Sequence, residues 1–132
     1  MSRKLMLALP LLLATGCETT PRPYAPVQDV RYSALGENPF WMLTIGDDRI
    51  VLRTGSGTGD DAAMRESVWP RTLPRTVEDK QIWESSVGTQ VITVETSPGP
   101  CADSRGRNYE DHVRVRLSGA ELIGCGGRLV RG

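Results

Sequence analysis

The chain has 132 residues, with 16 basic side chains, 16 acidic side chains and a single histidine. This length suits one small domain built around one hydrophobic core. The balanced charge excludes the basic excess with which nucleic-acid-binding proteins neutralise phosphates, so we expect no nucleic acid among the partners.

The first sixteen residues have the parts of a bacterial export signal. Arg3 and Lys4 form a short positive segment, and an apolar run from Leu5 to Ala14 follows it. The run is too short to span a membrane, which takes about 20 apolar residues, but it has the length of a signal-peptide core. We therefore expect residues 1–16 to be removed on export.

Small residues lead directly into a cysteine at the end of this signal. The sequence Ala14-Thr15-Gly16-Cys17 resembles the lipobox of bacterial lipoproteins, although Ala14 stands where that family usually has leucine. The resemblance implies that Cys17 carries several acyl chains, such as palmitate, which anchor a protein more firmly than one chain does. Glu18 favours the outer membrane, on the periplasmic side, by resemblance to the enterobacterial sorting rule. An ordinary secretory signal with an incidental cysteine is the alternative.

The segment after the cysteine differs in composition from the rest of the chain. Residues 17–29 contain several threonines and prolines, which are typical of an extended tether. From residue 30 to residue 132 the pattern changes to short runs of β-branched and aromatic residues, so we expect a single β domain, with Val30–Ala34 as its first strand.

A first hairpin is expected around the turn Asp47-Asp48. Placing a two-residue turn there brings apolar residues opposite one another on one face, as a half-buried antiparallel pair requires. The expected pairs are Ile45 with Ile50, Leu43 with Leu52, and Trp41 with Thr54. We expect Phe40 and Trp41 to lie in the core.

The segment from Thr54 to Pro74 has the pattern of a long loop. It begins with a glycine-rich run, and Ala62–Glu66 could form one helical turn. Met64, Val68 and Trp69 could cap an open end of a barrel, whereas the alternative is a disordered insertion anchored by one tryptophan.

Two further hairpins follow. Gln81–Ser85 and Gln90–Glu95 are joined through Val87-Gly88, and the last hairpin turns at Ser118-Gly119. The pairs expected in the last hairpin are Leu117 with Ala120, Val115 with Leu122, Val113 with Gly124 and, on the other face, Arg116 with Glu121. The chain thus predicts an all-β fold, a small antiparallel β-barrel or sandwich of about seven strands with a meander-like order.

Two cysteines, Cys101 and Cys125, remain after Cys17 is assigned to lipid. Paired thiols persist as disulfides in the oxidising compartment that an exported domain meets. Closing this loop should stabilise the fold by roughly 3 kcal/mol. A redox or metal-binding pair is the alternative, but the chain has no Cys-x-x-Cys motif.

Two stretches resemble a known family. Tyr32 to Trp41 follows the pattern Y-x-A-x-G-x-x-P-F-W, and Pro98 to Gly127 follows P-G-P-C-x-D…Y…V-x-V…G-C-G. Together they are similar to small, largely uncharacterised bacterial envelope lipoproteins that are grouped with META-domain and C-type-lysozyme-inhibitor-like lipoproteins. The resemblance implies a β fold, the cysteine pair and an envelope location. The sequence departs from the family pattern between Asp103 and Tyr109.

Residues that could support catalysis or metal binding are few. Asp111 and His112 are sequence neighbours, which on a strand point to opposite faces, and no Gly-x-Ser-x-Gly motif exists. Asp103, Glu110, Asp111 and His112 match no metal-ligand spacing. We therefore expect no enzyme activity, no metal and no cofactor.

Binding to another protein is the remaining class of function. The segment Ala102–Asp111 offers Arg105, Arg107 and Tyr109 as partner contacts, since arginine and tyrosine are common interface anchors, although Tyr109 could instead be a buried plug. The partner could be an envelope protein or, for an inhibitor, a lysozyme-type hydrolase. A structural role in envelope assembly and the carriage of a small apolar ligand are further alternatives.

Overall fold

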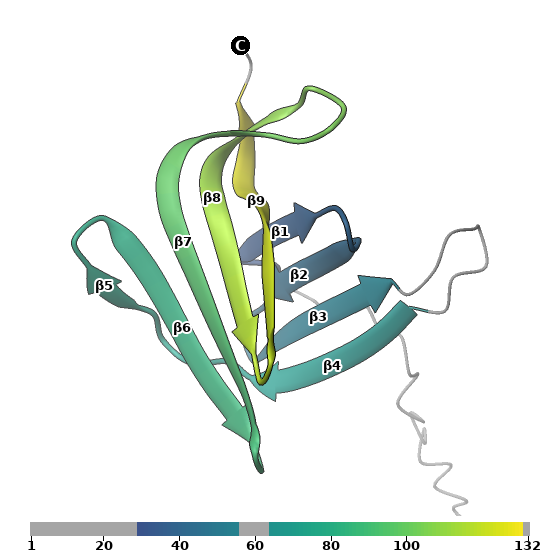
Figure 1. The fold of residues 1–132 in the computed structure, drawn as a ribbon. Coiled ribbons are helices and arrows are strands. Elements are labelled where there is room, and N and C mark those ends of the chain that lie inside the picture. Colours follow the sequence, from purple (N-terminus) through teal and green to yellow (C-terminus); the bar gives the residue numbers. More distant parts are fainter. Residues whose placement is uncertain (1–28, 56–63, 131–132) are drawn as a thin grey trace, which may run out of the picture.

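The computed structural model describes residues 29–55 and 64–130, which form one curled antiparallel sheet (Figure 1). This part of the chain is all β and contains no helix, as the sequence predicts. Its strands are β1 (Tyr32–Gly36), β2 (Trp41–Ile45), β3 (Arg49–Gly55), β4 (Met64–Pro70), β5 (Arg75–Val77), β6 (Lys80–Val87), β7 (Gln90–Ala102), β8 (Asn108–Leu117) and β9 (Ala120–Val130).

The strand order places both ends of the described chain in the middle of the sheet. The order is β4-β3-β2-β1-β9-β8-β7-β6-β5, so β1 and β9 are neighbours and β4 and β5 form the edges. The sheet curls until the end of β4 reaches β6 and the β6–β7 turn. There the Ser85 hydroxyl donates to the carbonyl of Pro70, and Trp69 Nε1 donates to the carbonyl of Gln90. The result is a half-barrel (Figure 1).

The hairpin registers agree with the predictions. Ile45 pairs with Ile50, and the amide of Gly46 donates to the carbonyl of Arg49 around the turn Asp47-Asp48. The last hairpin has all four predicted pairs, including Arg116 opposite Glu121. In both hairpins the alternation of apolar residues fixed which face points inward.

The prediction of a long loop from Thr54 to Pro74 is wrong for most of the described residues in that range. Met64–Pro70 is strand β4, which pairs with β3, so the predicted helical turn does not form at Met64–Glu66. Trp69 pairs with Ile50 and is buried, whereas Val68 points to the opposite face and is exposed. β4 and the three-residue strand β5 bring the number of strands in the described residues to nine, against about seven predicted.

The main core fills the inside of the half-barrel. Trp41 is only 1% exposed and packs with Trp69, Trp83 and the aliphatic side chains of the central strands. The prediction for Trp41 is therefore confirmed. Phe40 was expected in the core as well, but its side chain is 46% exposed because it lies in the turn before β2.

The features predicted for the N-terminus fall on residues that the structure does not describe. Cys17, the signal segment 1–16 and all but the last residue of the tether 17–29 lie outside the described residues. Across residues 29–55 and 64–130, no helix is long and apolar enough to cross a membrane.

Candidate functional site

A disulfide joins β7 to β9 on the face of the sheet opposite the main core. Cys101 and Cys125 are bonded, with their Cα atoms 5.5 Å apart, as the sequence predicts. Ala34 belongs to the main core, so its neighbour Leu35 points the other way, and Leu35 pairs with Cys125. We call this side the outer face. The disulfide, Leu35 and Tyr109 form a second, separate cluster there.

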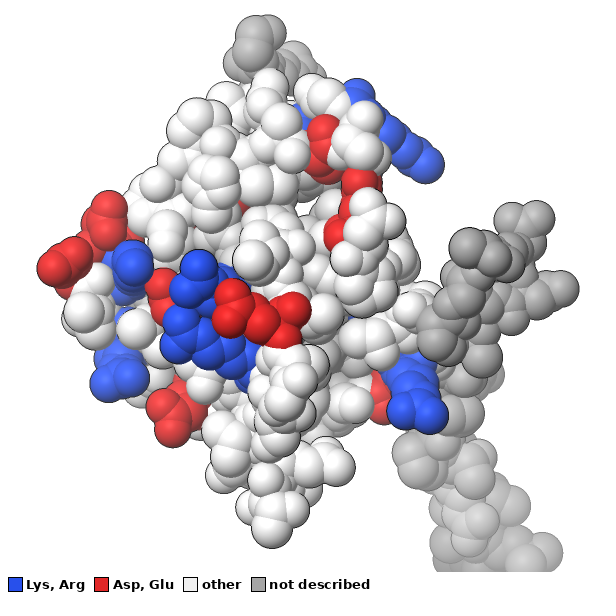
Figure 2. All heavy atoms as spheres, in the orientation of Figure 1, with Lys and Arg blue, Asp and Glu red and all other residues white. Residues whose placement is uncertain are grey.

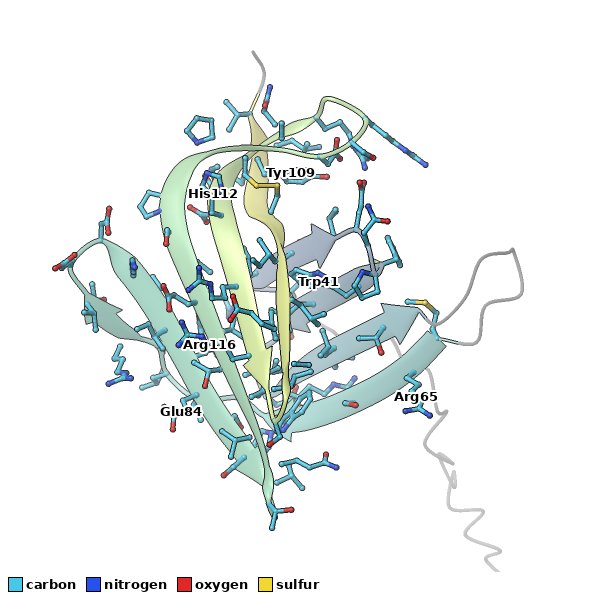
Figure 3. The ribbon with its side chains drawn as sticks, in the orientation of Figure 1. Trp41, Arg65, Glu84, Tyr109, His112 and Arg116 are labelled. Carbon is cyan, nitrogen blue, oxygen red and sulfur yellow. A yellow bond between two sulfur atoms is a disulfide. The ribbon has the colours of Figure 1, made fainter. Side chains whose placement is uncertain are left out.

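The chain on either side of the disulfide folds over this outer face as an arm, residues 98–109. Register shifts between Pro98 and Cys101 in β7 and between Tyr109 and Asp111 in β8 bend both strands. Figure 1 shows the ends of β7 and β8 curving over above β9 and β1. Bulges of this kind bend a strand and redirect its side chains. They explain how Tyr109 comes to lie beside the disulfide (Figure 3).

The tip of the arm is closed around the carboxylate of Asp103. Its Oδ1 accepts the backbone N–H groups of Arg105 and Arg107 at 3.0 and 2.9 Å, and its Oδ2 lies 2.7 Å from Arg107 Nε. Gly106 supplies the positive φ that the turn requires. Burial alone would raise the pKa of Asp103, but these hydrogen bonds outweigh it and lower the pKa. The tip is therefore a closed, charge-compensated turn.

The three predicted contact residues have different surroundings. Arg105 is exposed at the tip, and Arg107 is about half exposed while paired with Asp103. Tyr109 is only 7% exposed and packs against the disulfide, so the structure agrees with the alternative in which it is a buried plug. The arm thus presents arginine side chains outward and keeps its aromatic ring inside.

A groove lies between the arm, the β1–β2 turn and β9. Its volume is about 300 Å³. The Ser104 hydroxyl donates to Glu37 Oε1 at 2.8 Å and so connects the arm to the β1–β2 turn at the groove. The lining residues come from four separate parts of the chain: Leu35–Asn38, Cys101–Ser104, His112 and Ile123–Cys125. The two stretches that carry the family resemblance therefore meet here, which their separation in the sequence did not predict.

Glycines allow β1 and β9 to approach each other under the groove. A Cβ atom at Gly124 would lie 2.0 Å from the carbonyl oxygen of Leu35, and one at Gly36 would lie 1.9 Å from Trp41 Nε1. Trp41 Nε1 in turn donates to the carbonyl of Ile123 at 3.3 Å. This hydrogen bond connects the floor of the groove to the main core. A glycine inside a strand signals such close approach, and this was the available sequence clue.

The acidic residues and the histidine considered for metal binding or catalysis are engaged by separate partners. Glu110 accepts the backbone N–H of Arg128, and Asp111 accepts the Tyr32 hydroxyl at 2.9 Å. His112, on the other face of β8, lies over Gly99. Within residues 29–55 and 64–130, no three His, Cys, Asp or Glu side chains form a group that could hold a metal ion.

The contact between Tyr32 and Asp111 links β1 to β8 across β9. The tyrosine ring also packs on Trp83, with ring centroids 5.7 Å apart, and its hydroxyl would lie 2.5 Å from a Cβ atom at Gly126. Burial is the main reason that the pKa values of both Asp111 and Tyr32 are raised. This hydrogen-bonded pair stabilises the packing of β1 and β8 at the edge of the main core, away from the groove.

Charged side chains of both signs cover the outer face below the groove (Figure 2). Lys80 lies 3.2 Å from Glu95, and Arg114 lies 3.1 Å from Glu121. Arg116 lies between the two carboxylates, 4.0 Å from each. These five side chains, three cations and two carboxylates, form one connected network of ion pairs.

The chain was compared with families, curated proteins and solved structures. No family model, no curated protein and no solved structure matches it. The function must therefore be argued from the residues and their geometry.

Proposed function

We propose that this chain is a non-enzymatic, lipid-anchored lipoprotein of the bacterial envelope, whose β domain binds a partner protein at the groove beneath the arm. The export signal and Cys17 support the envelope location, with the outer membrane as the expected site. The disulfide supports folding in an oxidising compartment.

One observation carries the binding proposal. The arm is fastened over the outer face by a disulfide, and the groove beneath it is lined by apolar and polar residues from four separate parts of the chain. Apolar side chains lie exposed beside it, with Ile123 62% exposed and Met42 41% exposed on the strand next to Leu35. Exposed apolar surface with a polar rim is typical of protein-interaction sites.

The anchor is tested by labelling. Cells that express the full-length chain and are fed radiolabelled palmitate should incorporate label into the wild-type protein and none into the Cys17→Ser variant. An unlabelled wild-type protein, or equal labelling of the variant, would contradict the lipid anchor while leaving the binding proposal standing.

The binding surface is tested by capture from detergent-solubilised envelopes with the full-length chain. Ile123→Lys places a charge in the groove and should abolish the recovery of any partner that the wild type retains. Val91→Lys is the matched control, because Val91 is also exposed but lies by the β6–β7 turn, far along the sheet. If Ile123→Lys captures the same partner as the wild type, the groove is not the binding surface.

A second candidate function is inhibition of a lysozyme-type cell-wall hydrolase. The observation that favours it is the closed tip of the arm, which presents Arg105 from a turn fixed by Asp103. A preorganised loop loses little freedom on entering a cleft. The full-length chain should then inhibit a lysozyme in a cell-wall lysis assay, and Arg105→Ala should weaken the inhibition. Unaltered lysis with the wild-type chain would exclude the lysozyme tested.

A further inference from the structure

The chemistry of the groove restricts what can fill it. Its floor is apolar and is formed by Leu35, Ile123 and the disulfide, and glycines at the β1–β9 contact keep that floor free of other side chains. An aliphatic chain lying on this floor would cover the exposed face of Ile123 and gain the free energy of apolar burial.

The rim of the groove is polar, and neither a lysine nor an arginine lines it. The lining residues include the carboxylate of Glu37, the amide of Asn38, the hydroxyl of Ser104 and the imidazole of His112. Asp103 also lines the groove, yet its charge is compensated by Arg107 and two backbone N–H groups. Glu37 interacts electrostatically with Arg107, but Arg107 is paired with Asp103. Glu37 is therefore the lining group that can attract a further positive charge, and Ser104 holds its Oε1 in place.

The size of the groove also restricts its occupant. Pockets for drug-sized ligands and cofactors span about 300–1,000 Å³. At about 300 Å³ this groove is at the lower end of that range, so it suits one or two side chains better than a cofactor. An apolar floor that ends at a carboxylate matches a side chain with an aliphatic stem and a cationic head.

We propose that the groove receives an arginine or lysine side chain from a loop of the partner protein, with its methylene groups on Leu35, Ile123 and the disulfide and its charged end at Glu37. The inference rests on the proposed function of protein binding and adds the chemistry that the groove recognises. It also reverses the arrangement expected from the sequence, in which arginines of this chain would enter a cleft of the partner.

The test uses capped amino acids as probes of the groove. N-acetyl-arginine amide and N-acetyl-lysine amide are titrated into the isotope-labelled full-length Cys17→Ser chain with its disulfide intact, and amide shifts are followed by NMR. The shifts should concentrate on Gly36, Asn38 and Gly124. N-acetyl-norleucine amide, which keeps the stem but lacks the charge, should bind more weakly, and N-acetyl-glutamate amide should produce no shifts there.

The Glu37→Gln variant tests the ionic contact. It should bind the arginine and lysine probes about two- to fivefold more weakly, which is the range for one ion pair at a surface, and it should bind the norleucine probe unchanged. Glu84→Gln, exposed on β6 away from the groove, is the control and should leave all affinities unchanged. Equal binding of the glutamate and arginine probes, or an unchanged arginine affinity in Glu37→Gln, would overturn the proposal.

The outcome can be separated from that of the proposed function. If Ile123→Lys abolishes capture of a partner but the cationic probes do not bind at the groove, the partner binds at the groove without a cationic side chain, and only the present inference is overturned. If the probes bind as expected but Ile123→Lys leaves capture intact, the partner binds elsewhere, which overturns the proposed function and, with it, the assignment of the side chain to that partner.

Discussion

The main core and the cluster beneath the arm are stabilised in different ways. The main core packs three tryptophans and many aliphatic side chains between the two halves of the curled sheet. The cluster on the outer face contains only the disulfide, Tyr109 and part of Leu35. So small a cluster buries little apolar surface, and a covalent bond and bent strands hold it in place. We therefore expect that the cluster beneath the arm can be perturbed without unfolding the main core.

The largest effect should come from the main core. Trp41→Ala removes a fully buried ring and its hydrogen bond to the carbonyl of Ile123. We expect a loss of about 3–5 kcal/mol in the free energy of unfolding, measured by urea denaturation. Phe40→Ala is the matched control one residue earlier; because Phe40 is about half exposed, it should cost less than about 1.5 kcal/mol. Similar losses for the two variants would contradict the assignment of the core.

Removal of the disulfide should have the next largest effect and should be local. Replacing Cys101 and Cys125 together by serine opens a link across a sequence separation of 24 residues and should cost about 3 kcal/mol. Hydrogen exchange should show loss of protection in the arm while amides of β2 and β3 stay protected against local opening. If the arm and the core lose protection together, the two regions are one cooperative unit.

A smaller effect is expected where β1 and β9 meet. Gly124→Ala adds a methyl group against the backbone oxygen of Leu35, which cannot move aside as a side chain would. The cost should be about 1–3 kcal/mol in urea denaturation. Ser33→Ala, an exposed position on the neighbouring strand β1, is the control and should change stability by less than about 0.5 kcal/mol. A tolerated Gly124→Ala would show that the strands separate more easily than the packing implies.

The smallest effects concern pH, and the two regions should respond with opposite signs. The pKa of Asp103 in the arm is lowered, so its stabilising contribution is present above the ordinary value near 4 and is lost as the pH falls through the folded value. The pKa of Asp111 is raised, so its contribution is present below about pH 4 and is lost as the pH rises through the folded value.

Urea midpoints measured between pH 2 and 7 would check this difference. Relative to the wild type, Asp103→Asn should be least stable near neutral pH and should approach the wild type in acid. For Asp111→Asn, the stability relative to the wild type should be lower near pH 2 than at pH 6. The same pH trend for both variants would contradict the assigned pKa directions.

The sequence predicted the fold better than it predicted the site, for physical reasons. Hairpins such as β2–β3 are local, and their alternation and turn residues determine both register and inward face. Strand β4 escaped prediction because only Trp69 on it is fully buried and its other positions are polar or partly exposed.

The groove was less accessible to sequence analysis because it depends on contacts between distant segments. Two bulges turn the arm over the outer face, and the β1–β9 pairing brings Leu35 beside Cys125. The cysteines and Arg105 were found from their residue types, whereas Glu37 and Ile123 had no such signal. Tyr109 lies between the cysteines in the sequence, and its direction toward the disulfide depends on the bulge at the start of β8.

The pairing of β1 with β9 also has a consequence for the order in which the chain can fold. Ala34 has to find Gly126, and all the strands from β2 to β8 lie between them in the sequence. Contacts that span so much sequence form slowly, because the intervening loop must be closed before the contact is gained. In a chain that crosses a membrane from its N-terminus, β1 emerges early and has no β9 to pair with until the last strand has crossed. Until then the hairpins formed by β1 to β4 and by β6 to β8 are two unjoined halves with open edges, so we expect the domain to be most prone to aggregation before β1 and β9 pair.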